Sequence, residues 1–161
     1  MKIRIKIRLR SYNLIRQLCL LIALSSAALT LQAAESEIQV YKSATCGCCG
    51  KWVEHLRANG FKVTVTEVSS VAEYRAKLGV PNNLASCHTG VVNGYAVEGH
   101  VPAREIKKML EENPKAVGLA VPGMPVGSPG MEMGYRVDPY DVLLFAKDGS
   151  TTIYGKYQAS K

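Results

Sequence analysis

Three cysteines within four residues constrain this chain more than any other feature. Cys46, Cys48 and Cys49 form a C-x-C-C motif between an alternating apolar run at 38–41 and a helix-like run. At a helix start, thiols lie near unpaired amides and the positive end of the helix dipole, where the thiolate is favoured. Because the thiolate is both the nucleophile and the metal ligand, the motif predicts a redox or metal site. One disulfide with a buried third thiol is the structural alternative.

The first 34 residues have the composition of a secretory signal peptide. Residues 1–16 carry six basic side chains and no acidic one, an apolar run follows at 17–31, and Ala33 and Ala34 come next. The apolar run is too short and too interrupted by serine for a membrane span of roughly 20 residues. We therefore expect a periplasmic protein that has no membrane association after cleavage, and an uncleaved anchor is the alternative.

The net positive charge of the chain belongs to this leader. The whole chain has 20 basic and 13 acidic residues. Without the six basic residues of the leader, 14 basic residues face 13 acidic ones, a net charge of about +1. This balance removes the reason to expect a nucleic-acid partner, and we expect a monomer.

The first part of the exported chain predicts a parallel pair of strands. Residues 38–41 alternate as a strand, and Thr45 is a candidate helix N-cap. Asn59 and Gly60 end the helix, and residues 61–66 alternate as a second strand. A strand, a helix and a strand over about 30 residues are typical of a β-α-β unit.

The next elements complete a thioredoxin-like order. Ser70 and Glu73 form a capping box that opens a short helix. Residues 91–97 contain an Asn-Gly pair that suits a type I′ hairpin turn, and Pro102 begins a helix that stops before Pro114. The resulting order, β-α-β-α-β-β-α, is that of thioredoxin or glutaredoxin, with the cysteine motif at the start of the first helix.

A long segment rich in glycine and proline follows at 114–134, and it contains Met124, Met131 and Met133. Irregular segments of this length in compact domains are usually functional or disordered. A second hairpin at 142–154 is expected to anchor its far end.

We therefore predict an α/β protein in three parts. Residues 1–34 are the signal peptide, and residues 35–113 are the thioredoxin-like core. Residues 114–161 are a metal-binding loop and β-hairpin extension of the same domain.

Cys87 and His88 lie just before the first hairpin strand, in the loop that faces the C-x-x-C pair in thioredoxin-like folds. That loop usually carries a cis-proline, and a thiol and an imidazole stand here instead. A thioether is a soft, uncharged ligand that suits Cu(I) and is of little use to zinc. Met131 and Met133, and after them Met124, are therefore candidate copper ligands, although core filling is the usual role of methionine.

Two more histidines are interpreted differently. His55 lies two helical turns from Cys48, about 10 Å away, so capping or hydrogen bonding is its expected role. His100 precedes the last core helix, and for both histidines a ligand role is the less favoured alternative.

These motifs together resemble the CopG-like family, small periplasmic C-x-C-C proteins often associated with copper resistance. The stretches that carry the resemblance are 45–49 with Trp52, 55–56, 86–89, 97–102 and 123–134. The resemblance implies a thioredoxin-like domain whose C-terminal extension helps bind metal. It also implies a cysteine-bridged cluster of several coppers and a role in interconverting Cu(I) and Cu(II).

The resemblance also implies a ligand set. The bridging thiolates become Cys46, Cys48, Cys49 and Cys87. The extension's methionines, with His88, become the completing ligands.

We therefore predict a periplasmic copper-binding protein in which Cys46 and Cys49 are the catalytic pair if the site is redox-active. Its partners would be copper ions and copper chaperones or efflux components. A thiol–disulfide oxidoreductase using the same pair is the alternative, but Cys48, Cys87 and the missing proline argue against it. A zinc or iron–sulfur site comes last, because Cys48 and the methionines would then be idle.

Overall fold

The computed structural model describes residues 36–159, so the expected signal peptide at 1–34 lies outside the described residues. The strands are Glu37–Lys42 (β1), Lys62–Glu67 (β2), His88–Val92 (β3), Tyr95–Gly99 (β4), Gly118–Val121 (β5), Tyr140–Phe145 (β6) and Thr151–Tyr157 (β7). The helices are Gly47–Ala58 (α2), Val71–Lys77 (α3) and Ala103–Glu112 (α4), with a 3-10 turn at Asn82–Leu84 (η1). Across residues 36–159, no helix is long and apolar enough to cross a membrane.

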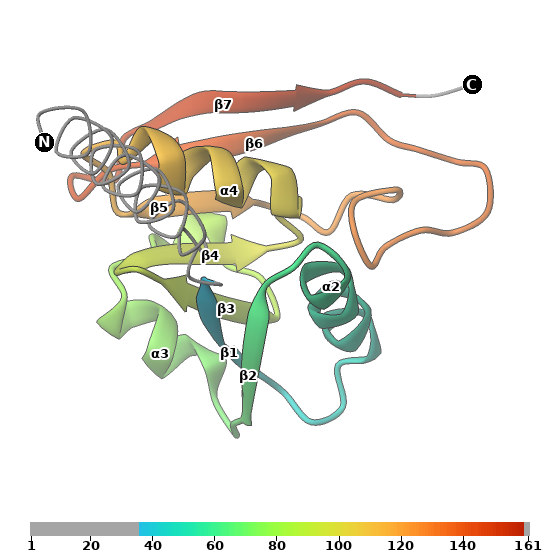
Figure 1. Cartoon of the computed structure of the whole chain (residues 1–161), viewed down its shortest axis with the longest axis horizontal. Coiled ribbons are helices and arrows are strands. Elements are labelled where there is room, and N and C mark those ends of the chain that lie inside the picture. The colour runs from blue at the N-terminus through green and yellow to red at the C-terminus, as the bar shows by residue number, and fades with distance from the viewer. Residues whose placement is uncertain (1–35, 160–161) are drawn as a thin grey trace, which may run out of the picture. The chain divides into compact units, whose positions relative to one another are not determined.

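The seven strands form one mixed sheet in the order β2-β1-β3-β4-β5-β6-β7 (Figure 1). Strand β1 pairs in parallel with β2 and antiparallel with β3, and β3 pairs antiparallel with β4. The β3–β4 turn places Asn93 at φ 47° and Gly94 at φ 85°, the two positive values that a type I′ turn needs. The α/β class, the parallel pair and this hairpin are confirmed.

One strand corrects the sequence analysis. Residues 114–134 were expected to be irregular, yet Gly118–Val121 forms the wholly buried strand β5, parallel to β4. A Cβ on Gly118 would lie 1.8 Å from the carbonyl oxygen of Ala96, so only glycine permits this pairing. A short apolar run buried on both faces lacks the alternation that reveals a strand. The predicted C-terminal hairpin, β6–β7, then pairs onto β5 and extends the sheet.

The core lies on both faces of the sheet. On one face, Trp52 and Leu56 of α2 and Ile106 and Met109 of α4 pack against the strands, all fully buried. On the other face, a smaller buried cluster includes Leu84 of η1, Ala120 of β5 and Phe145 of β6. Burying apolar surface stabilises the fold by about 25 cal/mol per Å². The buried side chains of α2 therefore hold this helix, and with it the cysteine motif, against the sheet.

Candidate metal centre

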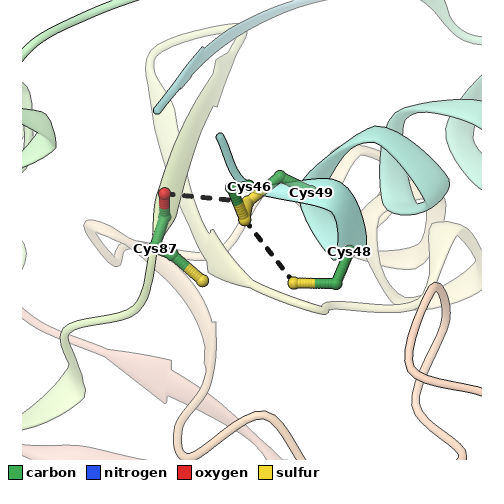
Figure 2. A group of neighbouring side chains, drawn as sticks. All are labelled: Cys46, Cys48, Cys49 and Cys87. Carbon is green, nitrogen blue, oxygen red and sulfur yellow. Dashed lines mark hydrogen bonds between the residues drawn. A yellow bond between two sulfur atoms is a disulfide. The ribbon is translucent and has the colours of Figure 1, made fainter. Parts of the chain in front are cut away.

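The structure brings together the four cysteines that lie within its described residues, 36–159. The Sγ atoms of Cys46, Cys48, Cys49 and Cys87 all lie within 4.8 Å of one another (Figure 2). Three come from the start of α2 and the fourth from the segment before β3, 38 residues later along the chain than Cys49. Cys46 and Cys49 are joined as a disulfide, and Cys48 and Cys87 are free.

The cysteine motif forms the first turn of α2. Cys46 is the N-cap residue, with φ −83° and ψ 97°, and its side chain makes no capping hydrogen bond. The predicted N-cap, Thr45, is therefore wrong by one position, because its hydroxyl pairs with that of Ser43 instead. No acidic side chain lies in the first turn, so the positive end of the helix dipole faces the sulfurs without neutralisation.

Direct contacts link the sulfurs. The Cys48 and Cys46 Sγ atoms are 3.5 Å apart, and the Cys48 thiol is the donor because Cys46 is oxidised and carries no proton. The Cys49 Sγ lies 3.8 Å from the carbonyl oxygen of Cys87. Cys49 is completely buried, whereas the other three cysteines are partly open to solvent.

A buried carboxylate that the sequence analysis did not single out holds the Cys87 segment. Glu98 of β4 has no exposed side-chain surface, and it accepts hydrogen bonds from the amide of Ser86 and the hydroxyl of Thr89. Arg75 of α3 donates to Glu98 over 3.1 Å and to the Ser86 carbonyl over 2.7 Å. Bonds on both sides of Cys87 thus fix its thiol opposite α2.

The Cys87 thiol is in a setting that disfavours its charge. Burial, followed by the neighbouring Cys48 sulfur, raises the pKa of Cys87 above its ordinary value of 9.0. The free thiol is therefore protonated at neutral pH. Binding a metal ion would have to displace that proton, so metal affinity should rise with pH.

Met124 is the methionine that the structure places against the cluster. Its sulfur accepts a 3.4 Å hydrogen bond from the thiol of Cys87. Met124 has φ 49°, a left-handed conformation that costs a residue with a Cβ roughly 1–2 kcal/mol. From the sequence, Met131 and Met133 are the stronger candidate ligands. Met131 is half-buried here, and Met133 is 66% exposed.

The segment that carries the methionines is tied to α2. The Met131 carbonyl accepts from the Gly127 amide, and the Met131 amide donates to the Ser128 carbonyl, which closes a tight loop. Inside this loop, the Pro129 carbonyl accepts a 2.8 Å hydrogen bond from Nδ1 of His100. His100 is therefore a positioning residue for the loop, a role that no local sequence pattern indicated.

Two buried imidazoles, those of His88 and His100, each carry one unpaired nitrogen. Nε2 of His88 donates to the Gly99 carbonyl over 3.0 Å, and Nδ1 of His100 donates to Pro129, so each ring's other nitrogen is a bare lone pair. Those two nitrogens, His88 Nδ1 and His100 Nε2, are buried without a hydrogen-bond partner. Their rings meet edge to face with centroids 4.9 Å apart.

Burial keeps both rings neutral. Burial first, and the neighbouring His100 second, lowers the pKa of His88 from its ordinary 6.5 to about 3. Burial also lowers the pKa of His100. A neutral ring with a free lone pair is the form of histidine that binds metal. His88 thus has the chemistry of its predicted ligand role, although neither ring belongs to the group of atoms within 4.8 Å.

His55 has the hydrogen-bonding role that was expected of it. Its Nε2 accepts a 3.0 Å hydrogen bond from the amide of Ala103, in the first turn of α4. The lone pair that a metal would need is therefore already used, and the imidazole joins α2 to α4 instead.

Comparison with known proteins identifies the family. A family described as "Protein of unknown function, DUF411" matches residues 84–131, and no curated protein matches the chain. Two solved structures match, each described as copper resistance protein CopG. The first, Form 2, is 50% identical with a TM-score of 0.73, and the match covers 76% of this chain and 98% of that one. The second, Form 1, is 51% identical with a TM-score of 0.72 over 76% and 97% of the two chains. The resemblance noted from the sequence is confirmed, and the chain belongs to the CopG-like family of copper resistance proteins.

Proposed function

We propose that this chain is a periplasmic protein that binds copper, its cargo and substrate, on a cluster of bridging thiolates. The carrying observation is the gathering of four cysteine sulfurs within 4.8 Å, with a thioether 3.4 Å from one of them. Adjacent sulfurs can each bridge two ions, so a cluster of this size suits more than one copper. The relatives described as copper resistance proteins support copper as the metal.

The donor set fits copper in its reduced state. Thiolates and thioethers are soft ligands that select Cu(I), whereas thioethers contribute little to zinc or to iron–sulfur sites. The unpaired nitrogen of His88 is a further donor that has no other use in the described part of the chain. In this proposal Cys46, Cys48, Cys49 and Cys87 bridge the ions. Met124, Met131, Met133 and His88 complete their coordination.

A redox role follows from the same geometry. The Cys46 and Cys49 thiols can close the disulfide seen here by giving one electron to each of two Cu(II), which yields two Cu(I) and two protons. The reverse reaction takes two electrons from two Cu(I) and two protons from solvent, and reopens the pair. In this account Cys46 and Cys49 are the catalytic residues and copper is the substrate.

The fold supports this placement of the pair. The strand order β2-β1-β3-β4, with β1 and β2 parallel and β3 antiparallel to β1, is consistent with the thioredoxin-like core that we propose within the seven-stranded sheet. We therefore assign residues 35–113 to that core, residues 114–161 to an extension that completes the metal site, and residues 1–34 to a cleaved export signal. A periplasmic copper chaperone or efflux component would supply or remove the ion.

Copper turnover tests the redox part of the proposal. The exported protein, reduced and free of oxygen, is mixed with excess Cu(II), and Cu(I) is followed with a chromogenic Cu(I) chelator in the presence of a thiol reductant. Catalysis predicts many Cu(I) per chain, above the rate with reductant alone, and loss of that excess in Cys46→Ser. Stoichiometric binding without turnover would make the protein a copper carrier or buffer.

The disulfide favours a second candidate, a thiol–disulfide oxidoreductase. Cys46 and Cys49 form a closed pair at the start of a helix, as such enzymes require. Insulin reduction by the metal-free protein distinguishes the two functions. An inactive metal-free protein would dispose of the oxidoreductase hypothesis, whereas activity independent of copper would favour it.

A further inference from the structure

With the Cys46–Cys49 disulfide closed, two thiols of the cluster and the thioether in contact with one of them are free to bind metal. Cys48 and Cys87 are free thiols, and both belong to the group of Sγ atoms within 4.8 Å. Figure 2 shows their sulfurs turned toward each other on one side of the disulfide. Met124 adds a thioether 3.4 Å from the Cys87 sulfur. We call Cys48, Cys87 and Met124 the sulfur triad.

We propose that the sulfur triad is a separate Cu(I) site that holds one ion while the Cys46–Cys49 disulfide is closed. This inference rests on the proposed copper function and divides its ligands by task. Cys46 and Cys49 exchange electrons, and the triad keeps a product ion on the protein when that pair can no longer ligate. Two thiolates and a thioether are a soft donor set that suits Cu(I).

The electrostatics of the triad agree with this division. Two thiolates and one Cu(I) carry a net charge of −1, and they lie at the N-terminal end of α2, where a negative charge is stabilised. In the disulfide form Cys46 and Cys49 carry no charge. The N-terminal end of α2 then stabilises the negative charge of the triad alone. Cys48 is the thiolate of the triad that lies in the first turn of this helix.

The triad also lies on the accessible side of the cluster. Met124 is 42% exposed and Cys87 is half-buried, whereas Cys49 has no exposed surface. The left-handed backbone of Met124, φ 49°, holds the thioether in place between solvent and the Cys87 thiol. A Cu(I) ion on the triad would therefore be the one within reach of a Cu(I) acceptor in solution.

The experiment compares Cu(I) binding in two oxidation states of the exported protein. The disulfide form and the fully reduced form are titrated under argon with Cu(I) acetonitrile complex against bicinchoninate. Copper per chain is measured by elemental analysis, free thiols by alkylation and mass spectrometry, and the number of sulfur ligands by X-ray absorption. Cys46→Ala/Cys49→Ala keeps the triad and removes the redox pair. Met124→Leu removes the thioether, and Tyr135→Leu is the control at a residue of the same loop that is 99% exposed and has no assigned ligand role.

The expected result is one Cu(I) per chain in the disulfide form and in the double variant, with the disulfide still closed after loading. Met124→Leu should weaken that site at least about tenfold, since changes to outer-shell partners of metal ligands alone cost about 10–100-fold, and Tyr135→Leu should not. An empty disulfide form beside a copper-loaded reduced form would overturn the triad and leave the proposed function intact. An equal affinity in Met124→Leu would remove Met124 from the site. Absence of copper from both forms would overturn the proposed function itself.

Discussion

Gly130 lies so close to Trp52 that a Cβ at position 130 would be 2.7 Å from the Trp52 backbone nitrogen. The same Cβ would be 3.0 Å from the carbonyl oxygen of Cys48. These two atoms belong to the first turns of α2, so the methionine-bearing loop rests directly on the backbone of the cysteine motif. Figure 1 shows the β5–β6 connection reaching back to this helix.

Gly130→Ala should therefore detach the loop from α2. Its Cβ has no space between backbone atoms, and φ +85° is strained for any residue with a side chain. We expect faster proteolysis within residues 122–139 and a lower copper content. The free energy of unfolding, measured in urea, should fall by at least about 1 kcal/mol more than in the control, the usual cost of overpacking.

Gly134→Ala is that control, because Gly134 also has a positive φ, +68°, but nothing lies within 4 Å of its Cβ position. Equal losses of unfolding free energy in the two variants would show that Gly130→Ala destabilises the protein through backbone strain alone. Contact between the loop and α2 would then make no contribution.

Glu98→Gln should destabilise the protein and loosen the Cys87 segment. Glu98 is fully buried and paired with Arg75, and removing one partner of such a pair typically costs about 3–5 kcal/mol. We expect a loss of about 3 kcal/mol or more in urea denaturation, and faster alkylation of Cys87 in the folded protein.

Glu37→Gln provides the comparison, since Glu37 pairs with Lys62 and both side chains are largely exposed. Solvent screens such pairs, so this variant should lose far less stability. A loss in Glu98→Gln no larger than that in Glu37→Gln would contradict the assigned role of the buried network.

The metal-free protein should lose stability as the pH falls below 6.5. The folded pKa of His88 is about 3, well under its ordinary 6.5, so the unfolded chain takes up the proton first. This contribution is fully present above pH 6.5 and is lost progressively toward pH 3. At pH 5 the loss of stability amounts to about 2 kcal/mol, and the lowered pKa of His100 acts in the same direction.

Urea midpoints from pH 8 to pH 4 measure this loss, and NMR of the imidazole nitrogens identifies its source. We expect both rings to stay neutral in the folded protein at pH 5, His88 with its proton on Nε2 and His100 with its proton on Nδ1. A His88 ring that titrates near pH 6.5 while the protein remains folded would contradict the prediction.

The fold could be predicted from the sequence wherever local chemistry and periodicity agree. The alternation in β1 and β2 and the Asn93-Gly94 turn are local signals, and the structure follows them. Strand β5 was missed because its pattern is set by burial on both faces, and because glycine and proline around it are typical of a loop.

The site could be predicted in part for the same reason. The C-x-C-C motif is contiguous, and the fold order indicated that Cys87 would face it. Glu98, His100 and Gly130 were missed because each acts through a partner distant in sequence: the Ser86 amide, the Pro129 carbonyl and the α2 backbone. The contact of Met124 with Cys87 and the exposure of Met133 likewise depend on the path of the loop.

Metal content and free thiols of the protein without residues 1–34 test the central claim most directly. The protein is purified without chelator beside a Cys48→Ser variant, and copper and thiols are counted per chain. The account predicts more than one copper per chain and a sharp loss in Cys48→Ser, because Cys48 is a bridging ligand. No copper, with two free thiols and a closed Cys46–Cys49 disulfide, would contradict it and favour the oxidoreductase.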